Sequence, residues 1–207
     1  MKSPYGPAYR IVTPRLVLRC WEPADTPALM ALIERNLHFL REWLYWAHDE
    51  PKPLAQKLAE VRHWRAEFDL DRMWSYAALD AESGELVGGM VIFQRDYGMA
   101  GETGGWFGQE FNGRGYHTEG SAVLARAAFE ILGLPKVQTT CSEQNAASIA
   151  VRRKLGFRND GTLRHLIDGR HRHELLWSML ADEFPASPAA EHASEARAFD
   201  ALGNRLF

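Results

Sequence analysis

A glycine-bounded turn, Gly113-Arg114-Gly115, separates a strand-like stretch, "ETGGWFG" (102–108), from a helix-like stretch that begins at Tyr116. Glycine leaves neighbouring backbone amides uncovered and permits the positive φ angles that a tight strand-to-helix turn uses. Uncovered amides at the start of a helix bind anions, usually phosphates. The turn therefore favours a phosphate-binding site, although a glycine-rich turn that binds no ligand fits the same residues about equally well. No Gly-Lys-Ser/Thr follows it, so a Walker-type nucleotide site is not expected.

Hydrophobic periodicity predicts a succession of strands and helices along the rest of the chain. We expect strands at 15–21, 74–79, 86–94, 102–108, 136–141 and 173–180, and helices within 22–46 and at 54–68, 116–132 and 145–157. This order predicts an α/β fold with a mixed, mostly antiparallel sheet and helices on both faces. A ligand is expected where the glycine turn leaves the end of its strand.

The composition is that of an ordinary globular protein, with 207 residues, 46% hydrophobic and 25% charged. The net charge of −3 gives no overall basic field for nucleic acid. The two cysteines, Cys20 and Cys141, fit a reducing compartment, and neither a signal peptide nor a run of ~20 apolar residues is present. We expect a cytoplasmic protein that binds neither nucleic acid nor membranes. Residues 1–185 should form one domain, and 186–207 a loose tail or a short amphipathic helix.

Three stretches resemble one family. "TPRLVLR" (13–19), "GWFGQEFNGRGYHTEG" (105–120) and "NAASIAVRRKLGF" (145–157) are similar to motifs of the GNAT superfamily of acetyl-CoA-dependent N-acetyltransferases. Within it they resemble the branch typified by RimJ and RimL, which acetylate the N-termini of ribosomal proteins. The likeness covers roughly residues 10–182. It implies a GNAT fold, with a splayed strand pair in the central sheet.

The resemblance implies a set of coenzyme-binding residues. The set is Trp106, Phe107, Gly108, Gly113, Arg114, Gly115, Tyr116, His117, Thr118 and Asn145. The amides of the glycine turn would hold the pyrophosphate of coenzyme A; Arg114 and His117 would add charge-assisted contacts, or be ordinary solvated side chains. Strand 102–108 would be splayed from 136–141, so that its free backbone groups pair with the pantetheine arm. Asn145 would hydrogen-bond the same arm, cap its helix, or both, and we interpret Glu119 as support for its helix.

Acetyl transfer requires a proton acceptor for the amine, donors for the oxyanion and a group that assists the leaving thiolate. Many members of the family place a tyrosine seven residues after the asparagine, where this chain has Arg152. Ser148 is therefore our candidate for the leaving group, the alternative being a helix serine that bonds back to the preceding turn. Glu102 is the candidate base, or else an edge glutamate in water. Backbone amides from Trp106 to Gly108 are the expected oxyanion donors.

The acceptor cleft is expected at Phe39, Trp43 and Trp46, because the family resemblance places the substrate near "NLHFLREWLYWAHDE" (36–50). Core packing of an amphipathic helix is the alternative for this segment. The histidines of "HLIDGRHRH" (165–173) have neither helical spacing nor nearby cysteines, so we predict no metal site.

We therefore predict an enzyme that transfers acetyl from acetyl-CoA, as co-substrate, to a primary amine. The acceptor is a protein N-terminal α-amine or an amine-bearing small molecule. Alternatives are an acetyltransferase that detoxifies an antibiotic or toxin, and a module that senses acyl-CoA without turnover. The oligomeric state is left open, with a homodimer as one alternative.

Overall fold

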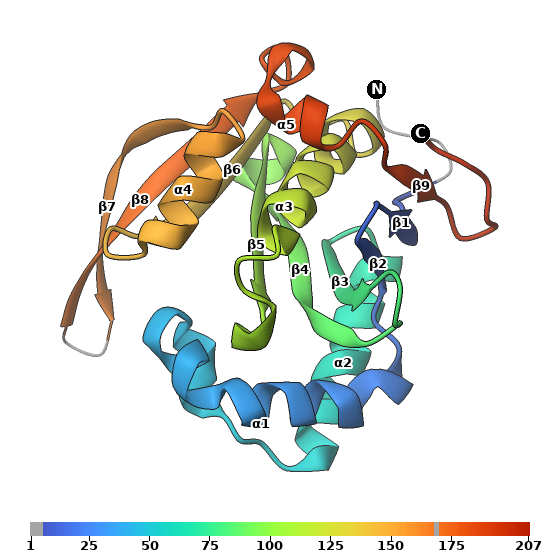
Figure 1. Ribbon diagram of the computed structural model, residues 1–207, viewed down its shortest axis with the longest axis vertical. Helices are drawn as coiled ribbons and strands as arrows, with labels where there is room; N and C mark the ends of the chain where they lie inside the picture. Colours follow the sequence, from blue (N-terminus) through green and yellow to red (C-terminus); the bar gives the residue numbers. More distant parts are fainter. Residues whose placement is uncertain (1–5, 168–169) are drawn as a thin grey trace.

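The computed structural model describes residues 6–167 and 170–207 and contains one nine-stranded sheet in the order β7-β8-β6-β5-β4-β3-β2-β1-β9 (Figure 1). The strands are β1 Arg10–Val12, β2 Leu16–Cys20, β3 Met73–Asp80, β4 Leu86–Arg95, β5 Ala100–Phe107, β6 Lys136–Ser142, β7 Arg158–Ile167, β8 Arg170–Leu180 and β9 Arg197–Phe199. The α-helices are α1 Thr26–Trp43, α2 Leu54–Asp69, α3 Tyr116–Arg126, α4 Ala146–Lys154 and α5 Pro188–His192. β5 and β6 run parallel, and the other neighbouring strands pair antiparallel. The predicted mixed, mostly antiparallel sheet is confirmed.

Helices cover both faces of the sheet, as the alternation along β4 shows. Met90 points toward α3, since a Cβ added to Gly120 of that helix would lie 3.1 Å from the methionine methyl carbon. Val91 and Phe93, which alternate with Met90, point to the opposite face, where α1 and α2 lie (Figure 1). Side chains on successive strand positions project to opposite faces, so β4 contributes to two separate environments.

The amphipathic stripe predicted for the first helix is confirmed. Leu29, Leu32, Ile33 and Leu40 of α1 are each at most 3% exposed. The stripe predicted for the second helix is only partly confirmed, because Val61 is buried whereas Leu54 is 56% exposed. Leu54 is the first residue of α2, and residues 54–56, which open this helix, are exposed.

Three strands were not expected from the sequence. The short strand β1 pairs antiparallel with β2. β7 pairs antiparallel with β8 and forms an edge of the sheet, and β9 pairs with β1 at the other edge. β9 lies in the segment that we expected to be loose or to form a short amphipathic helix. The same segment contains the five-residue helix α5. The last residue of the chain, Phe207, packs against α3, with its ring centre 4.0 Å from the guanidinium of Arg126.

Candidate active site

The parallel strands β5 and β6 pair at only two positions, Gly101 with Val137 and Glu102 with Gln138. On its other side, β5 stays paired with β4 as far as Phe107. The two parallel strands therefore part after Glu102, which is the predicted splay. Beyond this point, within residues 6–167 and 170–207, no strand pairs with the edge of β5 that faces β6.

Strand register decides which backbone groups of β5 face this gap. The amide of Gly108 donates to the carbonyl of Val87 on β4 at 3.0 Å. In an antiparallel ladder the backbone groups of Trp106 then also point toward β4, whereas those of Gly105 and Phe107 point away from it, into the gap. Of the three amides predicted as oxyanion donors, only that of Phe107 faces the gap. The sequence analysis missed Gly105, which the two-residue period of a strand places on the same edge.

The turn after β5 exposes a run of backbone amides. Gly113 and Gly115 have φ angles of +76° and +82°, and a Cβ built on Gly113 would meet no heavy atom within 4 Å. In the described chain, no amide of residues 113–118 donates to a protein acceptor, and no side chain caps the first turn of α3. These groups and the positive end of the helix dipole together suit a phosphate group.

Glu119 fixes this turn to the start of the chain. Its carboxylate, in a residue only 5% exposed, accepts hydrogen bonds from the Thr13 hydroxyl, from the Arg15 amide at 2.9 Å and from Arg15 Nε at 2.6 Å. Arg15 Nη1 also donates to the carbonyl of Arg114 at 2.5 Å. Glu119 is thus fully engaged within the protein, as expected for a supporting residue.

The hydroxyl of Tyr116 and the charge of Arg114 both lie away from the turn amides. The Tyr116 hydroxyl donates to Asp80 at 2.5 Å, a bond that raises the pKa of Tyr116 and lowers the pKa of Asp80 to about 2. The exposed guanidinium of Arg114 lies 5.4 Å from the centre of the Phe111 ring. Tyr116 can therefore contribute its ring and its amide to a ligand, and Arg114 its amide.

His117 lies in the first turn of α3, 5.8 Å from the Phe107 ring between centroids, with Nδ1 3.2 Å from the Ser121 hydroxyl. Burial and, second, the positive charge of Arg152 lower the pKa of His117 to about 4. The imidazole is therefore neutral near pH 7. It lies beside the turn, and the charge-assisted contact that we predicted for it stays a prediction.

These elements enclose a cavity of about 680 Å³, which we call the glycine-turn cavity. Residues that the sequence singled out and that line it are Phe39, Trp43, Trp106, Phe107, Gly113, Gly115, Tyr116, His117, Thr118, Asn145 and Ser148. Gly108 and the side chain of Arg114 are not part of its wall. Lys154, the last residue of α4, lines it as well.

Asn145 and Ser148 form the α4 side of this cavity. Asn145 caps the helix, since its Oδ1 accepts a hydrogen bond from the Ser148 amide at 2.9 Å. The Asn145 side-chain amide group remains for a ligand, so one residue can fill both predicted roles. The Ser148 hydroxyl makes no hydrogen bond to the preceding turn among the described residues, which removes the alternative interpretation of this serine.

Glu102 lies apart from the cavity. Its carboxylate accepts a hydrogen bond from Arg95 Nε at 2.9 Å, across from β4. Arg95 pairs with Ala100, two residues from Glu102, so the two charged side chains are diagonal neighbours on adjacent strands. The structure does not bring Glu102 together with Ser148 or with the glycine turn.

A second cavity of about 490 Å³ lies between the sheet and helices α1 and α2. We call it the tryptophan cavity, because four indoles line it: Trp21, Trp46, Trp64 and Trp106. Leu44, Gly105 and Trp106 belong to the walls of both cavities. Of the predicted acceptor residues, Trp46 therefore faces this cavity, 5.6 Å from Trp106 between ring centroids, while Phe39 and Trp43 face the other. Sequence reasoning missed Trp21 and Trp64, because periodicity assigns them to a strand end and to a helix stripe.

Two lysines and two glutamates also line the tryptophan cavity: Glu50, Lys52, Lys57 and Glu60. Lys57 and Glu50, with side chains 2% and 4% exposed, form a buried ion pair. Lys57 also contacts Glu60 at 2.7 Å, and Glu60 accepts from Lys52 at 2.5 Å. Both carboxylates are thus neutralised by the protein's own lysines.

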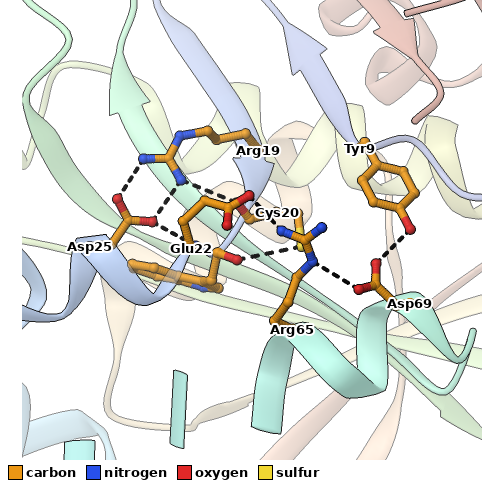
Figure 2. A network of polar contacts seen from close by, with 8 residues as sticks. Tyr9, Arg19, Cys20, Glu22, Asp25, Arg65 and Asp69 are labelled. Carbon is orange, nitrogen blue, oxygen red and sulfur yellow. Dashed lines mark hydrogen bonds and ion pairs between the residues drawn. The ribbon is translucent and has the colours of Figure 1, made fainter. Parts of the chain in front are cut away.

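A polar network holds the segments that carry two of the indoles (Figure 2). Arg65, next to Trp64 on α2, donates to Glu22 at 2.5 Å and to Asp69 at 2.9 Å. Glu22 directly follows Trp21, so its bond to Arg65 ties the end of β2 to α2. The two indoles lie 5.7 Å apart between centroids.

Within residues 6–167 and 170–207, no group of three or more histidine, cysteine, aspartate or glutamate side chains is arranged to hold a metal ion. His165 lies 3.6 Å from Glu174 and His173 lies 3.8 Å from Glu143, each with one carboxylate, and the side chain of His171 lies outside the described residues. Over the same ranges, no helix combines the length and the apolar character that a membrane crossing requires.

Comparison with known proteins identifies this arrangement. The Acetyltransferase (GNAT) domain family matches residues 15–158. A Bacillus subtilis protein that carries the name ribosomal N-acetyltransferase YdaF is 28% identical over 177 residues, which cover 84% of this chain and 95% of the relative. Among solved structures, Mycobacterium smegmatis RimJ in complex with a CoA-disulfide superposes with a TM-score of 0.73 at 24% identity, over 90% of this chain and 95% of the other.

The ribosomal L7/L12 α-N-protein acetyltransferase RimL in complex with coenzyme A superposes with a TM-score of 0.74 at 19% identity, over 82% of this chain and 96% of RimL. The parted strands and the glycine turn described above thus belong to a fold that binds coenzyme A in similar proteins. The expected GNAT fold and the expected family are both confirmed. This chain is a member of the GNAT acetyltransferase family.

Proposed function

We propose that this acetyltransferase moves the acetyl group of acetyl-CoA to a primary amine of low pKa that is carried on an apolar, preferentially aromatic body. One observation carries the proposal: two cavities of different chemistry meet at Gly105 and Trp106. One has uncovered amides and a free strand edge. The other has four indoles. A group held in the first lies next to a group held in the second across this shared wall.

The glycine-turn cavity fits acetyl-CoA, which would supply the activated acyl group. The amides of residues 113–118 suit its pyrophosphate. The backbone groups of Phe107 and the amide of Gly105, which face the gap, suit the amides of its pantetheine arm. The side-chain amide of Asn145 and the hydroxyl of Ser148 lie on the opposite wall. We assign Ser148 to assistance of the leaving group, because its hydroxyl is on the cavity wall and is not used by the helix.

The acceptor must arrive as a neutral amine, because the described walls hold no good base. The glycine-turn cavity has no aspartate or glutamate on its wall, and both glutamates of the tryptophan cavity are paired with lysines. A histidine with a pKa of about 4, as for His117, is a weak proton acceptor. At pH 7 an α-amine is roughly 10% neutral, whereas a lysine side chain is ~0.04% neutral. An N-terminal α-amine, or a small-molecule amine of similar pKa, therefore fits better than a lysine.

The indoles favour an apolar or aromatic group next to that amine, because they offer large flat apolar surfaces. The test is a panel of amines with acetyl-CoA, followed by thiol release and by the mass gain of one acetyl group. The panel holds peptides with aromatic, small and acidic N-terminal residues, an N-blocked lysine peptide, and amine-bearing antibiotics and toxins. We expect the α-amines of peptides with aromatic first residues to react fastest.

Trp46→Ala should raise KM for the aromatic acceptors, while Leu202→Ala, at a residue that is 85% exposed and lines neither cavity, should not. Equal rates on blocked lysine peptides and α-amines would contradict the low-pKa argument. Tight acetyl-CoA binding with no thiol release from any amine would show a sensing module instead.

A further inference from the structure

Arg152 of α4 is a buried cation without a counter-ion. The residue is 6% exposed, its Nη2 donates to the Thr139 hydroxyl at 3.0 Å, and its Nη1 donates to the Ser148 carbonyl at 3.4 Å. Its Nε has no hydrogen-bond partner, and in the part of the chain that the structure describes no carboxylate pairs with it. An uncompensated buried charge is strongly unfavourable, so a bound group of negative charge would relieve it.

The nearby thiol of Cys141 does not compensate this charge. Cys141 is on β6, 8% exposed, and burial raises the pKa of its thiol more than the charge of Arg152 lowers it. The thiol is therefore neutral near pH 7. The guanidinium itself stays protonated, since arginine loses its proton only at very high pH even when burial lowers its pKa, as it does here.

Arg152 lies at the narrow end of the gap between β5 and β6. Its partner Thr139 directly follows Gln138, the last residue of β6 that pairs with β5. One helical turn before Arg152, Ser148 lines the glycine-turn cavity. The charge of Arg152 also reaches His117 on another wall of that cavity, where it contributes to the lowered pKa of the imidazole.

This position is where the thioester end of the coenzyme would point, on the function proposed above. The phosphates would be held at residues 113–118, which follow the wide end of the gap. An arm that runs from there along the free edge of β5, past Phe107 and Gly105, leads back toward the narrow end. The backbone amides of that edge can serve the oxyanion. Arg152 lies behind the cavity wall at this end, next to the lining residues Ser148 and Val151 of its own helix.

We propose that Arg152 stabilises the thiolate that leaves during acetyl transfer. The neutral amine attacks the thioester carbonyl carbon and forms a C–N bond. The C–S bond then breaks, its electron pair stays on sulfur as coenzyme A thiolate, and the proton of the nitrogen goes to water. The positive charge of Arg152 lowers the free energy of the thiolate without donating a proton.

The test measures the thiol pKa of bound coenzyme A from the ultraviolet absorbance of the thiolate, after subtraction of the ligand-free protein. The variants are Arg152→Met, which removes the charge at similar length, Arg152→Lys, which keeps it, and Arg153→Met, an exposed neighbour, as matched control. We expect the thiol pKa in the wild type and in Arg153→Met to be ~1–3 units below that in Arg152→Met, with Arg152→Lys in between. Acetyl-CoA affinity should change little, while kcat falls about tenfold or more in Arg152→Met.

Other titratable groups around this site are His117 on α3, Cys141 on β6, Glu174 on β8 and Lys154 on α4, and none of them differs between these variants. If Arg152→Met does not fold, the thiol pKa of coenzyme A bound to the wild type tests the proposal by itself. A bound thiol with the same pKa as free coenzyme A overturns the proposal, as does an equal pKa in wild type and Arg152→Met. Failure of the wild type to bind coenzyme A at all would instead refute the proposed function.

Discussion

Replacing Gly113 by valine separates the role of the turn amides from the stability of the fold. Gly113 has a φ angle of +76°, and a Cβ at this position meets no heavy atom within 4 Å. The substitution therefore causes backbone strain but no clash, at ~1–2 kcal/mol for a non-glycine residue in the left-handed region. For a protein of this size ~1 kcal/mol lowers Tm by ~2–4 °C, so we expect a loss of ~2–8 °C.

The effect on coenzyme binding should be much larger. The side chain would cover amides that have no acceptor among the described residues, and strain would turn these amides away from the phosphates. A hydrogen bond to a charged group contributes ~1.5–3 kcal/mol, so loss of two such bonds removes ~3 kcal/mol or more. This corresponds to a rise of about 100-fold or more in the Kd for acetyl-CoA.

Titration calorimetry with acetyl-CoA, together with thermal unfolding, checks both numbers. Gly203→Val is the matched control, since Gly203 has a φ angle of +83°, open space around its Cβ position, and no place on either cavity wall. The control should lose similar stability and bind acetyl-CoA like the wild type. If Gly113→Val binds acetyl-CoA as tightly as Gly203→Val, the turn amides do not hold the phosphates.

Three other perturbations test the site and its surroundings. The folded chain binds the proton of His117 less readily than the unfolded chain, whose histidine has a pKa of 6.5. Stability from this residue should therefore be complete above pH ~6.5 and fall by ~1.4 kcal/mol per pH unit toward pH 4, with a histidine NMR titration midpoint near 4. Ser148→Ala should lower kcat with acetyl-CoA affinity unchanged in steady-state and binding assays, and an unchanged kcat removes the serine from the mechanism. Lys57→Met should cost ~3–5 kcal/mol in urea unfolding because Glu50 is left buried and unpaired, and Glu50→Gln in the same chain should restore most of it.

Local pattern was sufficient for the elements that carry their own periodicity. The helices at 26–43 and 146–154 begin and end within a few residues of the predicted ranges. The apolar stripe of the first and the capping residue Asn145 of the second are visible in the sequence. β7 was missed because its residues, "RNDGTLRHLI", are largely polar and lack a clear alternation. Pairing with β8 makes this segment a strand, and the sequence pattern of 158–167 does not reveal that pairing.

The site shows the same division between local and tertiary information. The glycine turn, Asn145 and Ser148 are local motifs, and the structure places all of them on one cavity. Glu102 was chosen from its place on a strand, but the strand beside it supplies Arg95, which takes its carboxylate. Trp21 and Trp64 come from separate elements and meet only through tertiary packing. The amino-acid sequence therefore does not indicate that both line the tryptophan cavity.

The distribution of charge indicates which cavity takes which substrate. The chain as a whole carries a net charge of −3. The glycine-turn cavity nevertheless has no acidic residue on its described wall, and it combines the amides of 113–118 with Lys154 and, beneath the wall, the unpaired Arg152. The tryptophan cavity has two glutamates and two lysines that neutralise one another. On the function proposed above, a polyanionic carrier would therefore be stabilised on the first side, and a neutral amine with an apolar body would fit the second. Because Gly105 and Trp106 form the boundary, substitutions there should affect both substrates at once, whereas those farther out affect one.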